Sequence, residues 1–442
     1  MNKHFLKIIR DNTPETLKLI TAFFLRNRLI KNKEFLKYYN LLEERESLCP
    51  DSIKEYQFNQ LKHILIHSYK NVPYYHQLFD RISFDPSKFS DFDQMRIIPF
   101  LTREIIQNNF DRLKSKVKVK NGFYIGKTGG STGMQLKILQ DFDSIFKENA
   151  FIYSYRKKLK YNFKDKMVTF RQIEFSNRLS RLNPMHNELI FFPLKISKKT
   201  IEVFAKKLIE FNPQYLNGYL SAIWYFTRLL DEYKIKPDIK LKGIFLTSEN
   251  MDYKQRQFIE QFYNTESATF YGHTERCVIA DEVAPNRYMF DPYYGYTEKV
   301  PLGNNDYLIV GTGFLNHTMP LIRYKTDDIC SPYDQYYSIK GKRKSDVGLY
   351  GFNDEFLPNT TFDLDKDVFR NIISYQFIQK VKGKADLLII VNNNFQIAEM
   401  KMIKDEIFSQ TDGIIDIDIK IVENLILSPR GKYQMYVSTI NG

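Results

Sequence analysis

Gly126-Lys127-Thr128-Gly129-Gly130-Ser131-Thr132-Gly133 is the stretch around which we expect this chain to fold. Its glycines leave too little side chain to fill a core, and successive backbone N–H groups of such a run can converge on an anion. Its hydroxyl residues add further donors, and Lys127 adds a positive charge. Phe123-Tyr124-Ile125 precedes the stretch and an alternating apolar run follows it, so we predict a strand, an exposed loop and a second strand. The run lacks the closing Gly-Lys-Ser/Thr of a Walker A loop, and a plain hairpin turn is the alternative to a phosphate-binding loop.

The composition is that of a globular protein with a large core, because 43% of the 442 residues are apolar and 26% are charged. The 65 Lys and Arg exceed the 52 Asp and Glu, and the formal net charge of +13 favours anionic partners such as nucleotides. These basic residues are spread along the chain without a long basic block, so we expect no nucleic-acid partner.

Cysteines and apolar segments indicate the compartment. Cys49, Cys277 and Cys330 lie far apart and form no Cys-x-x-Cys pair, which argues against a disulfide framework and favours the reducing cytoplasm. The first residues do not form a signal peptide, and no apolar run approaches ~18 residues, so we expect no membrane span. The segment Leu17–Ile30 mixes apolar and basic residues; peripheral membrane association and packing on its own domain are the two alternatives.

Apolar periodicity predicts an α/β architecture. The first 70 residues form a helical lead-in, and Asn71-Val72-Pro73 ends its last helix. Farther along, helices and strands alternate: a helix from Ser197, a strand at 215–219, a second helix, and a buried strand at 243–247. This order predicts mixed sheets flanked by helices, in which ligands bind beyond the carboxyl ends of strands.

The remainder of the chain is predicted to form β-strands first and then a small α/β unit. Strands are expected between Tyr296 and Cys330, including one at Leu321–Thr326 that ends in Asp327-Asp328. The charged passage Gly341–Asp346 is interpreted as an interdomain hinge. We therefore predict a large N-terminal domain over residues 1–342 and a mobile C-terminal domain over residues 343–442.

Four polar clusters at predicted strand ends carry groups suited to a nucleotide. The glycine stretch can hold phosphates, and Glu275 can help to hold Mg²⁺, which prefers oxygen ligands. Tyr271 offers a flat face to adenine, and Asp328 offers an acceptor to ribose hydroxyls. Each has a structural alternative: acids at strand ends usually face water, a Tyr-Gly step is usually a turn, and a lone His such as His273 is usually structural.

The ordered motifs resemble those of the adenylate-forming (ANL) superfamily, from roughly residue 60 to the end. Thr128–Gly133 is similar to its phosphate loop, Tyr271-Gly272-His273-Thr274-Glu275 to its Tyr-Gly-x-Thr-Glu motif, and Pro320–Asp328 to its strand ending in Thr-Gly-Asp. Further stretches resemble the phenylacetate–CoA ligase branch and its CapK-like capsular polysaccharide biosynthesis relatives: Val72-Pro73-Tyr74-Tyr75, Ile98-Pro99-Phe100-Leu101-Thr102 and Pro213–Tyr219.

The resemblance implies a large adenylate-forming domain, a small C-terminal domain and a role for each matching residue. The residues implied for ATP are Thr128, Gly129, Gly130, Ser131, Thr132, Gly133, Ser248, Glu249, Tyr271, Gly272, Thr274, Asp328 and Arg343. The others are Glu275 for Mg²⁺, Asp346 as the hinge, Lys432 and His273 as catalytic candidates, and Tyr215, Gly218 and Tyr219 for the acid.

Three departures from the family pattern matter. Asp327 replaces the usual Gly, which puts the turn that places Asp328 in doubt. The usual Gly-Arg pair reads Gly341-Lys342-Arg343, and we prefer Arg343 because Asp346 then falls at the family spacing. The region after Glu275 lacks the cysteines of a metal site that some ligases of the branch carry, so we expect no zinc.

The implied function is an ATP-dependent ligase that activates a carboxylic acid as an acyl adenylate and releases AMP and pyrophosphate. The acyl acceptor is open: an amine of an amino sugar or amino acid, in capsule or O-antigen modification, or a thiol such as coenzyme A. A non-catalytic nucleotide-binding protein of a polysaccharide operon is the alternative from another class. Formation of AMP and pyrophosphate with any acid separates the two classes.

Overall fold

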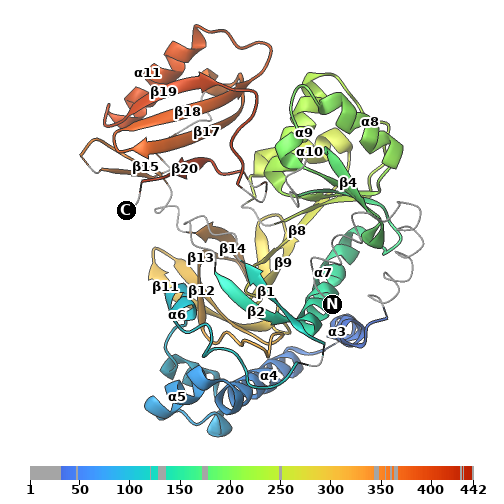
Figure 1. The fold of residues 1–442 in the computed structure, drawn as a ribbon, viewed down its shortest axis with the longest axis vertical. Helices are drawn as coiled ribbons and strands as arrows, with labels where there is room; N and C mark the ends of the chain where they lie inside the picture. The colour runs from blue at the N-terminus through green and yellow to red at the C-terminus, as the bar shows by residue number, and fades with distance from the viewer. Residues whose placement is uncertain are drawn as a thin grey trace. The chain divides into compact units, whose positions relative to one another are not determined.

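The structure is a computed structural model that describes residues 31–45, 48–119, 121–127, 136–171, 178–247, 251–342, 348–353, 355–358, 361–362, 367–428, 431 and 433–440. Its contacts divide the chain into two compact units. Unit 1 comprises Met1–Phe163, Pro184–His186 and Ala268–Gly341, and unit 2 comprises Lys164–Asn183, Asn187–Ser267 and Lys342–Gly442. The mixed α/β fold predicted from the sequence is confirmed (Figure 1). The domain division at residue 342 stays a prediction.

The helical lead-in belongs to unit 1. Its described helices are α3 (Lys33–Glu44), α4 (Pro50–Asn71) and α5 (Pro73–Arg81). Pro73 ends α4 as predicted, but the same proline also opens α5, which the sequence analysis did not include. A proline has no N–H to lose in the first turn, and its fixed φ suits that position. None of the described helices is long and apolar enough to cross a membrane, and residues 17–30 lie outside the described part of the chain.

A hairpin and a helix follow in unit 1. Strands β1 (Phe123–Lys127) and β2 (Lys137–Asp141) pair antiparallel, and α7 (Phe142–Arg156) starts directly after them. Asp141 caps this helix, because its Oδ1 accepts a hydrogen bond of 2.6 Å from the Ser144 amide. The earlier helix α6 (Arg103–Asn108) is capped in the same way, because the Thr102 side chain accepts from the Ile105 amide.

Antiparallel strands build the sheet of unit 1 (Figure 1). Neighbouring strands follow the order β11 (Gly295–Gly303), β12 (Asp306–Gly313), β13 (Tyr324–Tyr333), β14 (Tyr336–Lys342), β10 (Arg287–Phe290), β9 (Ile279–Ala284) and β8 (Ser267–Gly272). The predicted strand at Leu321–Thr326 is wrong in both bounds, since the strand starts at Tyr324 and continues to Tyr333. The core beneath these strands includes Tyr75, Leu101 and Tyr324.

Unit 2 contains the predicted alternation of strands and helices in a mixed sheet, in which only β4 runs antiparallel to its neighbour among the strands named here. Its strand order is β7 (Gly243–Leu246), β6 (Tyr215–Gly218), β3 (Met167–Phe170), β5 (Glu188–Phe191) and β4 (Ser180–Asn183). The helices are α8 (Ile201–Phe211), α9 (Leu220–Glu232) and α10 (Tyr253–Tyr263). The predicted helix start at Ser197 is wrong, because Ser197 and Thr200 bond each other in a turn before α8 begins.

The C-terminal part of unit 2 is the small α/β unit expected from the sequence. Its sheet has the order β19 (Asp416–Ile421), β18 (Lys384–Val391), β17 (Ile372–Val381) and β20 (Tyr436–Ser438). Helix α11 (Glu399–Thr411) packs on this sheet through Ile403 and Ile407, and β15 (Gly348–Tyr350) pairs with β16 (Phe356–Pro358). Short 3-10 turns complete the described elements: η2 (Pro86–Lys88), η3 (Phe92–Ile97), η4 (Lys157–Leu159), η5 (Pro184–His186), η6 (Pro193–Lys195) and η9 (Asp367–Phe369).

Candidate active site

The base of the glycine stretch is a regular hairpin. The last pair of its ladder is Lys127 opposite Lys137, so residues 128–136 form the connection. This connection is longer than the two-residue turn of a tight hairpin. The two predicted strands are therefore confirmed. The predicted phosphate-binding residues Thr128–Gly133 lie outside the described residues.

A buried amide ties this hairpin to the Tyr-Gly-His-Thr-Glu motif. Gln140 on β2 lies opposite Tyr124 on β1, and the Tyr124 hydroxyl donates to the Gln140 Oε1. The Gln140 Nε2 donates to the backbone carbonyl of Thr274 at 2.6 Å. Gly126 leaves room for this amide, since a Cβ there would lie 3.0 Å from the Gln140 Oε1. Gln140 was not predicted from the sequence, because its partner Thr274 is 134 positions away and no local pattern points to it.

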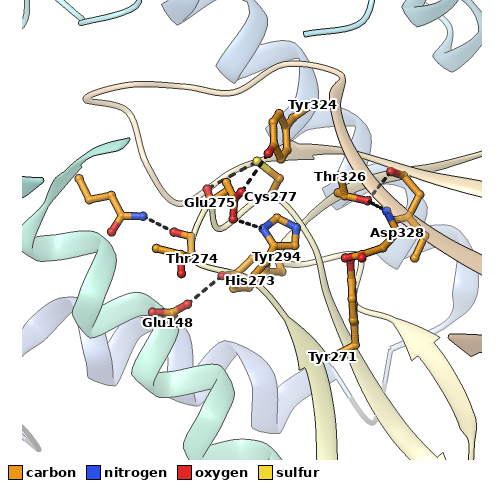
Figure 2. Close-up of polar contacts among 12 residues, drawn as sticks. Glu148, Tyr271, His273, Thr274, Glu275, Cys277, Tyr294, Tyr324, Thr326 and Asp328 are labelled. Atoms are coloured by element: carbon orange, nitrogen blue, oxygen red, sulfur yellow. Dashed lines mark hydrogen bonds and ion pairs between the residues drawn. The ribbon is translucent and has the colours of Figure 1, made fainter. Parts of the chain in front are cut away.

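The motif itself sits at the end of a strand, as predicted. Tyr271 and Gly272 are the last residues of β8 and pair with Ala280 and Ile279 of β9. The three following residues leave the sheet and are drawn in Figure 2. They carry the hydroxyl, imidazole and carboxylate groups of the predicted site.

Glu275 is a buried carboxylate whose two oxygens have different partners. Its Oε1 accepts a hydrogen bond of 2.9 Å from the Tyr324 hydroxyl, and its Oε2 lies 3.3 Å from the His273 Nδ1 (Figure 2). Burial by itself raises the pKa of this carboxyl, but the bond and charge of His273, with the Tyr324 bond, lower the pKa to about 2. Glu275 is therefore ionised at neutral pH, as a ligand of a hard cation must be.

His273 lies between two aromatic rings and has an imidazole nitrogen to spare. Its ring centroid is 6.1 Å from that of Tyr271 and 6.2 Å from that of Tyr324. The His273 Nδ1 lies 3.3 Å from the Glu275 Oε2. Its buried Nε2 has no hydrogen-bond partner among the described residues. A group of the ligand that reaches this nitrogen would satisfy it.

Arg276 anchors the motif on helix α7. Its guanidinium donates to Glu148 at 2.7 Å and to the Ser144 hydroxyl at 3.0 Å. Although burial disfavours its charge, Glu148 keeps the pKa of Arg276 above the ordinary value. Gly313 lets β12 approach this segment, since a Cβ there would lie 2.4 Å from the Arg276 carbonyl oxygen. The motif is thus fixed from two sides.

Asp328 is placed by a bulge in β13. The register jumps between the pairs Leu308–Ile329 and Val310–Lys325, which leaves residues 326–328 outside the regular ladder. The Thr326 hydroxyl donates to the Ile309 carbonyl at 2.8 Å and accepts from the Asp328 amide at 3.1 Å. The Asp328 Oδ2 then accepts a bond of 2.7 Å from the Tyr271 hydroxyl. Burial and this carboxylate raise the pKa of Tyr271 well above its ordinary value.

Asp327 takes the conformation that a glycine would take at its position. Its φ is +66°, in the left-handed region that glycine enters freely and that Asp tolerates better than most residues. Its side chain is exposed, with the carboxylate 3.7 Å from the Lys325 ammonium. The departure from Thr-Gly-Asp therefore leaves the turn intact, and Asp328 still reaches Tyr271.

The stretch Ile98–Thr102 supports the same strand. Leu101 forms a bridge with Tyr324, with bonds from its own amide to the Arg323 carbonyl and from the Lys325 amide to its carbonyl. Arg323 is buried and binds both Glu298 oxygens, so it serves packing rather than a ligand. This motif of the phenylacetate–CoA ligase branch thus positions the partner of Glu275.

The predicted acid-binding residues lie in unit 2. Tyr215 is fully buried and stacks on Phe245 with ring centroids 5.0 Å apart. Gly218 allows β6 to pass Phe170, because a Cβ there would lie 2.8 Å from the Phe170 carbonyl oxygen. Tyr219 precedes α9 as its N-cap residue and is partly buried. Their part in acid binding stays a prediction.

Five other predicted residues fall outside the described part of the chain: Ser248, Glu249, Arg343, Asp346 and Lys432. The surroundings of Lys432 are described in part. The buried Gln376 of β17 donates to the carbonyls of Ile426 at 2.7 Å and Gln434 at 2.8 Å, and accepts from the Ile426 amide. Gln376 therefore binds Ile426 and Gln434, which lie on either side of Lys432 in the sequence. Like Gln140, it has no signature in the sequence.

A metal at this site would depend on few protein ligands. Within the described ranges, no three His, Cys, Asp or Glu side chains are grouped so that they could hold a metal ion. Glu275 fits the need of Mg²⁺, which usually takes one or two carboxylates, phosphate oxygens and water. It is ionised, and its carboxylate has lone pairs beyond those used by Tyr324 and His273.

Comparison with known proteins agrees with these motifs. No family model matches the chain. It is 22% identical to Protein CapK of Staphylococcus aureus over 444 residues, which cover 94% of this chain and 96% of that protein. It is 28% identical to phenylacetate-coenzyme A ligase of Escherichia coli (strain K12) over 92 residues, 21% of each chain.

Solved structures share the fold. 2-Hydroxyisobutyryl-CoA ligase in the postadenylation state, in complex with R3-HIB-AMP, matches with a TM-score of 0.65 and 13% identity, covering 90% of this chain and 91% of that one. The same ligase with 2-HIB-AMP and CoA in the thioesterification state matches with a TM-score of 0.56 over the same shares. The predicted resemblance is therefore confirmed: this chain has the fold of the adenylate-forming ligases and resembles CapK over nearly its whole length.

Proposed function

We propose that this protein is an ATP-dependent ligase that joins a carboxylic acid to AMP, releases pyrophosphate, and then passes the acyl group to an acceptor. One observation carries the proposal. Within unit 1, the ionised Glu275, the Tyr271-supported Asp328 and the hairpin of the glycine stretch converge on the same motif. The similarity to CapK and the fold of an acyl-adenylate-binding ligase support it.

The chemical problem is repulsion between two anions. An acid carboxylate must approach the α-phosphate of ATP, and preorganised donors and cations lower the barrier as charge develops. In the proposal, Thr128–Gly133 donate backbone N–H groups to the phosphates, and Asp328 accepts from the ribose. Mg²⁺, when bound, neutralises phosphate charge, and Glu275 is the residue that would hold it.

Two residues are proposed to act on the reacting groups. Lys432, between the described residues Gly431 and Tyr433, would neutralise the charge that develops during adenylation. His273 would present its Nε2 to the bound ligand while Glu275 holds its Nδ1 side. In this proposal, rotation of residues 343–442 about Asp346 follows adenylation and admits the acceptor.

The acceptor is an amine or a thiol. We favour an amine of an amino sugar or amino acid, in modification of a surface polysaccharide. Coenzyme A is the alternative, supported by the ligases that share the fold. An exposed, unpaired Cys49 fits the reducing cytoplasm as the proposed location. The third possibility is a protein that binds ATP without forming AMP. It differs from both kinds of ligase because it would release neither AMP nor pyrophosphate.

Acid-dependent exchange of labelled pyrophosphate into ATP tests the proposal. Lys432→Ala should lower the exchange rate by about 10²–10³-fold, the usual cost of one such charge-stabilising group. Lys420→Ala is the matched control, since Lys420 lies in the same C-terminal part and only pairs with Asp386 on the surface. Equal exchange by the two variants would count against the proposed role of Lys432.

A further inference from the structure

Gln140 is deeply buried, and both polar atoms of its side-chain amide have a hydrogen-bond partner. Its residue exposure is 1%, so neither end of the amide can turn to solvent. The Thr274 carbonyl can only accept, which places the Nε2 toward it and the Oε1 toward the Tyr124 hydroxyl. The amide therefore links the two strands that flank the glycine stretch to the residue immediately before Glu275.

The link is short and lies on one face of the hairpin. Tyr124 and Gln140 are direct cross-strand partners, and Gly126 is two residues nearer the loop on the same strand. A Cβ at Gly126 would lie 3.5 Å from the Thr274 Cγ2, so the hairpin touches the motif beside the amide. On the neighbouring residue, the Leu139 carbonyl accepts from the Asn316 side chain at 2.8 Å, which fixes the strand from another direction.

We propose that Gln140 is a positioning residue that sets the register between the β1–β2 hairpin and the Thr274-Glu275 segment. This inference rests on the proposed function, in which this hairpin carries the phosphate-binding stretch and Glu275 holds the Mg²⁺ of the same nucleotide. A hydrogen bond of 2.6 Å to a backbone carbonyl holds the two segments at a fixed separation. Without it, each segment keeps its own groups, but the two sets lose their mutual alignment.

Variants of similar shape test the two hydrogen bonds of the Gln140 amide one at a time. Gln140→Glu keeps the shape but replaces the donor to Thr274 by an oxygen, while the other oxygen still accepts from Tyr124. Tyr124→Phe keeps the bond to Thr274 and removes the hydroxyl that donates to the Gln140 Oε1 and that also interacts with Arg276. Gln379→Glu is the matched control: Gln379 is 0% exposed, and its amide bonds both backbone groups of Tyr350 in the C-terminal part.

Steady-state kinetics and hydrogen exchange measure different consequences of losing the hydrogen bond from Gln140 to Thr274. Gln140→Glu should raise the KM for ATP about 10-fold, the effect of one lost buried hydrogen bond, without changing the KM for the acid. Tyr124→Phe and Gln379→Glu should change the KM for ATP by less than about 3-fold. Lowering the pH should bring the KM of Gln140→Glu back toward the wild-type value, because a protonated carboxyl can again donate to Thr274.

Hydrogen exchange tests the link without any activity. Amides in residues 123–127, 137–141 and 273–275 should exchange faster in Gln140→Glu than in the wild type or in Gln379→Glu. Unchanged exchange there, or a KM for ATP equal to that of Gln379→Glu, would overturn the inference. A wild type that forms no AMP while Gln140→Glu shows the faster exchange would reject the proposed function and retain the link.

Discussion

Replacing Glu275 by Gln tests the electrostatics of the site without changing its volume. A folded-state pKa of about 2, against the ordinary 4.5, corresponds to about 3 kcal/mol in favour of the ionised form at neutral pH. Because the folded-state pKa is depressed, this stabilisation is present above pH 4.5 and is lost as the pH falls toward 2. Glu275→Gln should therefore lower the unfolding free energy by about 3 kcal/mol at pH 7, with only about half of that difference remaining at pH 3.

Urea unfolding of both proteins at pH 7, 4 and 3 measures this difference. Tyr324→Phe is the control, because it removes one hydrogen bond to Glu275 but keeps the contact between Glu275 and His273. Its cost should be about 1 kcal/mol and should vary less with pH. A wild-type minus Glu275→Gln difference that is the same at pH 7 and pH 3 would refute the assigned pKa and its cause.

Three further substitutions test Asp328, Asp327 and Gln376. Asp328→Ala should weaken ATP binding about 10-fold or more in equilibrium titration, because it removes both the proposed ribose acceptor and the partner of Tyr271; unchanged affinity would contradict this. Asp327→Val should destabilise the protein by about 1–2 kcal/mol in thermal unfolding, since a β-branched residue resists a φ of +66°, whereas Asp327→Gly should not. Gln376→Glu should lower kcat for adenylation with little change in the KM for ATP, because Gln376 brackets the segment of Lys432; a change in KM alone would argue against it.

Local chemistry allowed much of the fold to be predicted. The alternation of helices and strands in residues 196–250 followed from apolar periodicity, and Asn71-Val72-Pro73 marked a helix end through proline sterics. The same local rules failed where one residue serves two elements. Pro73 closes one helix and opens the next, and the pair Ser197–Thr200 forms a turn before the helix instead of its start.

The residues of the candidate site were also predicted only in part. Tyr271, Glu275 and Asp328 were placed at strand ends from the sequence, and the structure joins the first and third directly. The side chains that hold them were not predictable, because Tyr324, Glu148 and Gln140 meet their partners only after the sheet and the hairpin have formed. The family pattern marked position 327 as one where glycine is usual, but the sequence alone did not show that Asp327 adopts the same positive φ.

Trapping with hydroxylamine tests the central claim most directly. The protein is incubated with Mg²⁺-ATP, hydroxylamine and a panel of carboxylic acids, and hydroxamate, AMP and pyrophosphate are quantified. The account predicts that at least one acid gives all three products in equal amounts, and that Asp328→Ala forms them much more slowly. ATP that stays intact with every acid, under conditions in which the wild type binds it, would contradict the claim that this site makes acyl adenylates.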